Sequence, residues 1–143
     1  MAVTFCGHGE IVYDDKVQQE LIFEITKQIK NGETEFLLGG YGNFDILAAK
    51  LVKTIKEKNP NIKSTLVLPY LDRKYDLDLY DGTIYPKLET IPKRFAILKR
   101  NEFMVVDMSS TIIAYVLHSW GGAAKTLNYA VKKNKAIINI AKK

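Results

Sequence analysis

The feature that most constrains the fold is a regular alternation of short apolar runs with segments of helical periodicity. Strands that alternate with amphipathic helices form βαβ units around a parallel sheet. The runs are almost continuously apolar, as burial on both faces of a strand requires. We therefore predict an α/β fold, a three-layer Rossmann-like domain with a five-stranded parallel sheet. Its strands are expected at residues 3–6, 36–38, 65–68, 111–117 and 136–140.

Helices are expected between these strands. The first begins after Asp14 or Asp15, either of which suits the N-cap position. The second, over residues 44–55, carries its apolar residues on one face. A third is expected at residues 93–106, and a fourth precedes the last strand. Residues 69–92 are rich in tyrosine and aspartate and show no regular pattern, which is compatible with a lid over a ligand.

Length and charge narrow the possibilities. The 143 residues suit one domain, so we expect a single domain over residues 1–143. The net charge of +5 suits an anionic ligand, but the lysines are scattered along amphipathic segments, which is typical of solvated helix faces. Because no arginine-rich run or aromatic RNA-binding pattern accompanies them, we do not expect nucleic acid as a partner.

The sequence also bears on location and on metals. No charged segment followed by an apolar stretch marks a signal peptide, and no apolar run approaches the ~18 residues that span a bilayer. We expect a cytoplasmic protein with no membrane partner. The two histidines, His8 and His118, are too far apart in sequence to form a metal motif, and we predict no metal and no cofactor.

Three glycine clusters directly follow predicted strands. They are Gly7-His8-Gly9, Gly39-Gly40-Tyr41-Gly42 and Gly121-Gly122. In a parallel sheet these positions share the carboxyl edge, where such folds bind ligands. Glycine lets the backbone approach a ligand closely, and a helix N-terminus offers free N–H groups to an anion. The clusters therefore predict a cleft that binds a nucleotide or another phosphate, although tight turns alone also use glycine.

Further motifs continue this series along the chain. Cys-Gly-His-Gly follows the first predicted strand, Gly-Gly-Tyr-Gly-Asn-Phe-Asp the second, and Pro69-Tyr70 the third. Lys99-Arg100-Asn101 and Met104 follow on a helix, and Trp120-Gly121-Gly122-Ala123 with Thr126 comes last. This ordered set spans nearly the whole chain. It resembles the SLOG superfamily, the SMF/DprA–LOG group of Rossmann-like domains, and especially its small YpsA-like members.

The resemblance implies a ligand derived from a nucleotide, bound along the carboxyl edge of the sheet. Relatives of the LOG type are phosphoribohydrolases that release a base from a nucleoside monophosphate. Their activity rests on an arginine in an Arg-Lys-x-x-Met segment and a glutamate in Gly-Gly-x-Gly-Thr-x-x-Glu. Here Arg100 and Met104 match the first segment, but Asn128 stands where the second has its glutamate.

We therefore predict a sensor or sequestering domain that binds a nucleotide derivative without hydrolysing it. A LOG-like phosphoribohydrolase that cleaves an N-glycosidic bond is the alternative, with no catalytic residue assigned. Because members of this group commonly associate, we also expect a homo-oligomer.

Several candidate residues have two interpretations. Arg100 either holds a phosphate or is a surface residue, and Asn101 either reads a base or ribose edge or caps its helix. Trp120 either stacks on a base or covers the sheet end or a subunit contact. Asp45 either favours the helix dipole or binds a ribose hydroxyl, and His8 either contacts a ligand or acts as acid/base. The residues predicted to bind the ligand are Gly7, His8, Gly39, Gly40, Tyr41, Gly42, Asn43, Asp45, Pro69, Tyr70, Arg100, Asn101, Trp120, Gly121, Gly122, Ala123 and Thr126.

Overall fold

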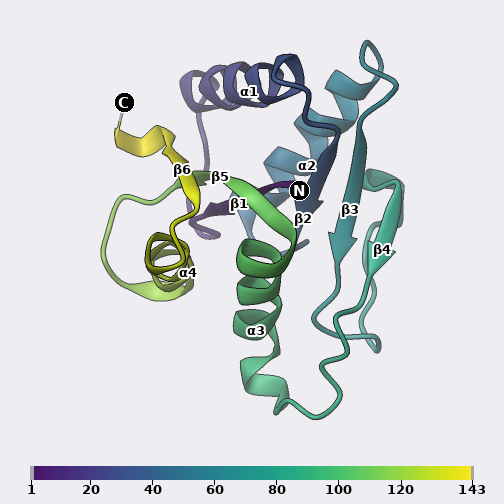
Figure 1. The fold of residues 1–143 in the computed structure, drawn as a ribbon, viewed down its shortest axis with the longest axis vertical. Coiled ribbons are helices and arrows are strands. Elements are labelled where there is room, and N and C mark those ends of the chain that lie inside the picture. Colours follow the sequence, from purple (N-terminus) through teal and green to yellow (C-terminus); the bar gives the residue numbers. More distant parts are fainter. Residues whose placement is uncertain (1, 143) are drawn as a thin grey trace.

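The computed structural model describes residues 2–142, which form one parallel sheet with helices on both sides (Figure 1). The strands are β1 (Ala2–Gly7), β2 (Glu35–Leu38), β3 (Lys63–Val67), β4 (Gly82–Ile84), β5 (Ser109–Tyr115) and β6 (Ala136–Asn139). The helices are α1 (Asp15–Lys30), α2 (Asn43–Lys56), α3 (Ala96–Glu102) and α4 (Gly121–Lys132). The strand order is β4-β3-β2-β1-β5-β6, and each pair of neighbours is parallel. The predicted three-layer Rossmann-like fold is confirmed.

The sheet has one strand more than predicted. β4 runs parallel to β3, and its three residues lie opposite Thr65, Leu66 and Val67. It was missed because it is short, begins with glycine and is buried on neither face, so it lacks the apolar pattern of the other strands. The prediction of a five-stranded sheet is therefore wrong by one edge strand, far from the centre of the sheet.

Side chains on opposite faces of the strands contribute to separate apolar cores. Val3 and Phe5 of β1 pack in one cluster with buried residues of α1 and α2. Cys6 of β1 packs in another cluster with Ile112 and Ala114 of β5 and with buried residues of α4. This alternation along one strand is what a sheet covered on both faces requires.

The ends of the helices follow their sequence signals only in part. Asp14, one of the two residues predicted as N-cap candidates, is the N-cap of α1. Its carboxylate accepts the Val17 N–H at 3.0 Å. The single helix expected at residues 93–106 is divided into a 3₁₀ turn, α3, and a π-helical stretch over Phe103–Met108. Within residues 2–142, no helix is long and apolar enough to cross a membrane.

The order of the strands reverses at β1. β2 follows β1 on one side, whereas β5, more than a hundred residues later, pairs with it on the other, with Cys6 opposite Ala114 and Gly7 opposite Tyr115. The loops that leave β1 and β5 therefore open side by side, and the His8 N–H donates to the Tyr115 carbonyl at 3.3 Å. Open parallel sheets bind their ligands at such a point of reversal.

Candidate functional site

A cavity of about 130 Å³ lies at this carboxyl edge, with walls from β1, the loop after β2, α3 and the start of α4. The three-layer fold thus brings together residues that are far apart in the sequence. The predicted ligand-binding residues that line the cavity are Gly7, Tyr41, Asp45, Arg100, Asn101, Gly122, Ala123 and Thr126.

Arg100 is the principal cation of this cavity and is only 2% exposed. Its Nη1 donates to the carbonyls of Gly39 and Val67, at the ends of β2 and β3, and its Nε donates to Asn101 Oδ1 at 2.8 Å. Nη2 makes no hydrogen bond within residues 2–142, and the guanidinium carbon lies 5.8 Å from the centroid of the Tyr41 ring. Burial lowers the pKa of the Arg100 guanidinium, and the nearby Asp45 opposes that shift.

Asp45 lies in the first turn of α2, and its carboxylate contacts the glycine loop that follows β2. Its Oδ2 accepts the N–H groups of Gly39 and Gly40 at 2.5 and 2.6 Å. These N–H groups were predicted to bind a ligand phosphate, but in the structure a carboxylate of the chain itself holds them. Burial raises the pKa of Asp45 to about 6, even though Arg100 and the loop N–H groups lower it.

The raised pKa of Asp45 predicts a specific pH dependence of stability. A carboxyl with a pKa of 3.8 when unfolded and about 6 when folded binds its proton more tightly in the native state. Ionisation therefore destabilises the fold, by roughly 3 kcal/mol, as the pH rises from about 4 to about 6. Asp45→Asn should remove this loss, so urea unfolding at pH 4 to 7 should show the variant gaining on the wild type as pH rises.

Asp81 provides a control of opposite sign. Burial raises the pKa of Asp81, but its hydrogen bond and ion pair with Lys56, 2.7 Å away, and the Ser64 N–H outweigh burial and leave the pKa lowered. Above pH 4, Asp81→Asn should therefore be less stable than the wild type by a nearly constant amount, and this difference should shrink as the pH falls below 4. If Asp45→Asn and Asp81→Asn shared one pH dependence, the assignment of a raised pKa to Asp45 would be wrong.

Two of the glycine clusters are explained by packing within the chain. A Cβ on Gly7 would lie 2.3 to 2.7 Å from side-chain atoms of Phe44, and a Cβ on Gly42 would lie 2.7 Å from the Gly9 Cα. Gly42 also has φ +86°, a conformation that side chains disfavour. The loops after β1 and β2 are thus in backbone contact. In contrast, a Cβ on Gly122 meets nothing within 4 Å, so the cavity is open at this glycine.

Other predicted residues lie outside the cavity. Pro69 and Tyr70 line a separate pocket of about 220 Å³, and the Tyr70 hydroxyl donates to the Lys93 carbonyl at 2.9 Å. The amide of Asn43 donates to the Ile11 carbonyl at 3.0 Å, which turns it toward the loop after β1. Trp120 is exposed and, although it immediately precedes α4, does not line the cavity.

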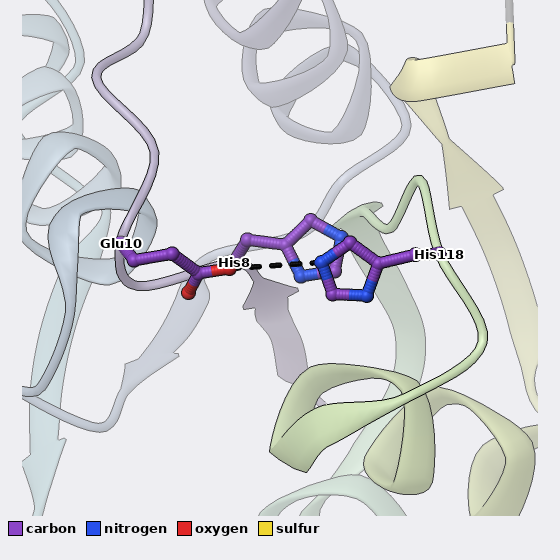
Figure 2. Close-up of side chains that lie close together, drawn as sticks. All are labelled: His8, Glu10 and His118. Atoms are coloured by element: carbon purple, nitrogen blue, oxygen red, sulfur yellow. Dashed lines mark ion pairs between the residues drawn. The ribbon is translucent and has the colours of Figure 1, made fainter.

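His8, Glu10 and His118 meet where the loops after β1 and β5 run side by side (Figure 2), a grouping that the sequence did not predict. One ligand atom of each lies within 4.8 Å of the others, as in a metal site. His8 Nε2, however, accepts the Leu117 N–H at 2.8 Å, and burial lowers the His8 pKa. Neutral His8 therefore carries its proton on Nδ1 and has no lone pair left for a metal.

The remaining two members of this group can provide two metal ligands at most, fewer than the three or four that zinc sites use. His118 Nε2 lies 3.6 Å from Glu10 Oε1, a separation that suits an ion pair when the imidazole is protonated. We interpret the three residues as a polar cluster around a buried, neutral His8, with Glu10 placed to pair with His118 when that imidazole is protonated.

Cys6 lines the cavity without acting as a nucleophile. Its Sγ lies 3.2 Å from the Ala123 carbonyl, and burial raises the thiol pKa to about 12. At neutral pH the side chain is therefore a protonated thiol, which is the unreactive form.

Comparison with known proteins places the fold. No protein-family profile and no functionally curated protein matches the sequence. Among solved structures, DNA processing protein A (DprA) from Helicobacter pylori covers 96% of this chain with a TM-score of 0.66 and 19% identity. DprA from Streptococcus pneumoniae covers 95% with a TM-score of 0.66 and 15% identity. The chain spans 63% and 48% of those two proteins, respectively.

A third similar structure is the molybdenum cofactor carrier protein of Chlamydomonas reinhardtii, with a TM-score of 0.59 and 21% identity. It covers 98% of this chain, which in turn spans 75% of the carrier. The proteins with this fold thus include one described as a carrier of a cofactor and one described by its single-stranded DNA binding mode.

The expectation that nucleic acid is not a partner is wrong. It rested on the scatter of lysines along the sequence, whereas the H. pylori DprA structure shows a protein of this fold described by its binding of single-stranded DNA. Linear scatter is a poor guide because the fold brings distant segments to one surface. The same comparisons agree with the resemblance drawn from the sequence motifs, and they show that the chain has a Rossmann-like fold.

Proposed function

We propose that this chain binds a nucleotide derivative, with the ligand phosphate in the cavity between Arg100 and the start of α4. The observation that carries the proposal is the buried guanidinium of Arg100, which has one nitrogen unused within residues 2–142 and lines an open cavity. A guanidinium held by backbone carbonyls is already oriented, so it loses little side-chain entropy when it binds an anion.

The start of α4 supplies a second positive element. Trp120 is its N-cap residue, and no side chain caps the helix. The first N–H groups of a helix have no partner within the helix and carry the positive end of its dipole. Because Gly122 and Ala123 line the cavity, the start of α4 borders the same space as Arg100.

The size of the cavity limits what enters it. A volume of about 130 Å³ is below the ~300–1,000 Å³ of pockets that enclose whole drug-sized ligands. A phosphate fits such a space, and the sugar and base of a nucleotide must then extend over the rim. Asp45 is the carboxylate that lines the cavity, and two backbone N–H groups already hold it. Because this carboxylate is engaged within the chain, we expect the ligand to bind without hydrolysis.

The test is thermal unfolding with AMP as the probe, followed by nucleoside diphosphates and ADP-ribose. At ~100 times its dissociation constant, a ligand stabilises the fold by ~2.7 kcal/mol, a shift of several degrees. Gly122→Val should leave the unliganded melting temperature almost unchanged, because the new side chain enters open space. Because Gly122 lines the cavity, the same side chain should obstruct the phosphate and abolish the shift.

Gly82→Val is the matched control. A Cβ on Gly82 also meets nothing within 4 Å, but this residue lies on the edge strand β4, away from the cavity. Its AMP shift should equal that of the wild type. If Gly122→Val keeps the full shift, the cavity does not hold the phosphate. Release of free adenine during the incubation would instead show a phosphoribohydrolase.

Single-stranded DNA is a second candidate ligand. It is favoured by the fold shared with H. pylori DprA and by the net charge of +5. DNA binding depends steeply on salt, because each neutralised phosphate releases counterions. Repeating the Gly122→Val comparison with a short oligonucleotide at two salt concentrations separates a strand that enters the same cavity from one that binds elsewhere.

A further inference from the structure

Three rings from the loops that follow β1 and β5 form a continuous stack. The Trp120 indole lies on the His118 imidazole with ring centroids 3.9 Å apart and an angle of 12° between the planes. His118 in turn lies on His8, again with centroids 3.9 Å apart and with an angle of 19°. His8 is buried, whereas Trp120 is 67% exposed. The stack therefore runs from the protein interior to an indole at the surface.

Hydrogen bonds hold the two histidine layers of the stack in place. His8 Nε2 accepts the Leu117 N–H at 2.8 Å, and its carbonyl accepts the Tyr13 hydroxyl at 2.6 Å. His118 Nδ1 lies 3.0 Å from the Trp120 carbonyl, and Glu10 flanks its Nε2 (Figure 2). The exposed indole therefore lies on two imidazoles that are themselves held by hydrogen bonds.

An exposed aromatic ring with one face covered and its orientation fixed is prepared for stacking. A ligand that stacks on a mobile side chain must first order it, and this loss of entropy weakens binding. The Trp120 ring is already ordered by its stack on His118. The covered face of the indole lies on two stacked imidazoles. A side chain that only fills the core would instead pack against aliphatic groups. The exposure of the indole leaves room for a further planar group on the stack.

We propose that Trp120 is the stacking platform for the base of the ligand. This inference rests on the proposed function, in which the phosphate lies at Arg100 and the start of α4. Trp120 immediately precedes that helix, and the cavity is too small for the sugar and base, so the base must lie outside it. The chemical class of ligand is thus a phosphate joined to a planar heterocycle.

Trp120 also reports on this binding directly, because it is the only tryptophan in the chain. AMP should quench its fluorescence on excitation at a wavelength that tyrosine does not absorb, and ribose 5-phosphate should bind without quenching. Trp120→Leu should weaken AMP binding by roughly 5- to 150-fold, as expected for the loss of one base–aromatic stack. Calorimetry should find ribose 5-phosphate affinity unchanged in this variant.

Val131→Ala is the control for the loss of an exposed apolar side chain. Val131 is 58% exposed near the other end of α4, so its removal should change neither affinity. His118 acts through Trp120 as a positioning residue. His118→Ala should lower the fluorescence anisotropy of Trp120 and weaken AMP binding, whereas His118→Phe, which keeps a planar ring, should restore both.

The results distinguish failure of the platform from failure of the phosphate site. If AMP binds and Gly122→Val abolishes binding, but Trp120→Leu does not weaken it, the platform is overturned and the phosphate site stands. If neither AMP nor ribose 5-phosphate binds, both proposals are overturned. If AMP leaves the emission unchanged but dilution of the protein alters it, Trp120 lies at a contact between copies, which also overturns the platform.

Discussion

Arg100→Met is expected to lower the free energy of unfolding by roughly 3–5 kcal/mol, the range found when one partner of a buried charged pair is removed. The guanidinium is 2% exposed and joins the ends of β2 and β3 through the carbonyls of Gly39 and Val67. Without it, these carbonyls lose their donor and the buried Asp45 carboxylate loses its nearest cation. Urea denaturation at pH 7 measures the loss.

Two further variants make this prediction specific. Lys99→Met removes a cation from the neighbouring position, where the side chain is half exposed and pairs with Glu102, and should cost at most about 1 kcal/mol. Asp45→Asn combined with Arg100→Met should recover part of the loss, because no buried charge is then left unpaired. A cost for Arg100→Met no greater than that for Lys99→Met would show that the buried guanidinium does not stabilise the fold.

Gly7→Ala is expected to destabilise the fold by roughly 3 kcal/mol, at the upper end of the cost of overpacking a core. The added Cβ would lie 2.3 Å from one ring atom of Phe44, which is fully buried at the start of α2. The backbone at Gly7 cannot move away from the ring, because Gly7 lies in the central strand pair of β1 and β5. Thermal and urea unfolding both report the change.

The control for Gly7→Ala is Gly82→Ala, whose Cβ meets nothing within 4 Å and should change stability by no more than about 0.5 kcal/mol. Removing the ring gives an independent check. In a Phe44→Ala background, Gly7→Ala should cost less than in the wild type, because Cγ and Cδ2, the two closest atoms of the clash, are then absent. Equal costs in both backgrounds would rule out the contact with Phe44 as the cause.

The fold could be predicted from sequence because its signals are local. Apolar runs such as Phe36-Leu37-Leu38 and the amphipathic face of residues 44–55 specify strand and helix without reference to the rest of the chain. β4 could not be predicted in the same way, because Gly82-Thr83-Ile84 becomes a strand only by pairing with β3. The π-helical stretch over Phe103–Met108 likewise has no local signal.

The site could be predicted only as far as it depends on the ends of the strands. Parallel strands place Gly7, Gly39 and Gly121 at one edge whatever their order, so the glycine clusters predicted the edge of the sheet that these residues share. The hydrogen bonds from the Gly39 and Gly40 N–H groups to Asp45 depend on tertiary geometry. They occupy N–H groups that the sequence had led us to expect on a ligand phosphate. The meeting of His8 with His118 required knowledge that β1 and β5 are neighbours.

The pairing of β1 with β5 also determines when the site can form. These strands join residues 2–7 to residues 109–115, so closing the centre of the sheet is a contact of very high sequence separation. Forming such a contact costs the loop-closure entropy before the contact stabilises the chain, and this slows folding. Arg100, the start of α4 and the ring stack all come together at this late step. Binding competence should therefore appear with the final folding phase, and no early intermediate should recognise the ligand.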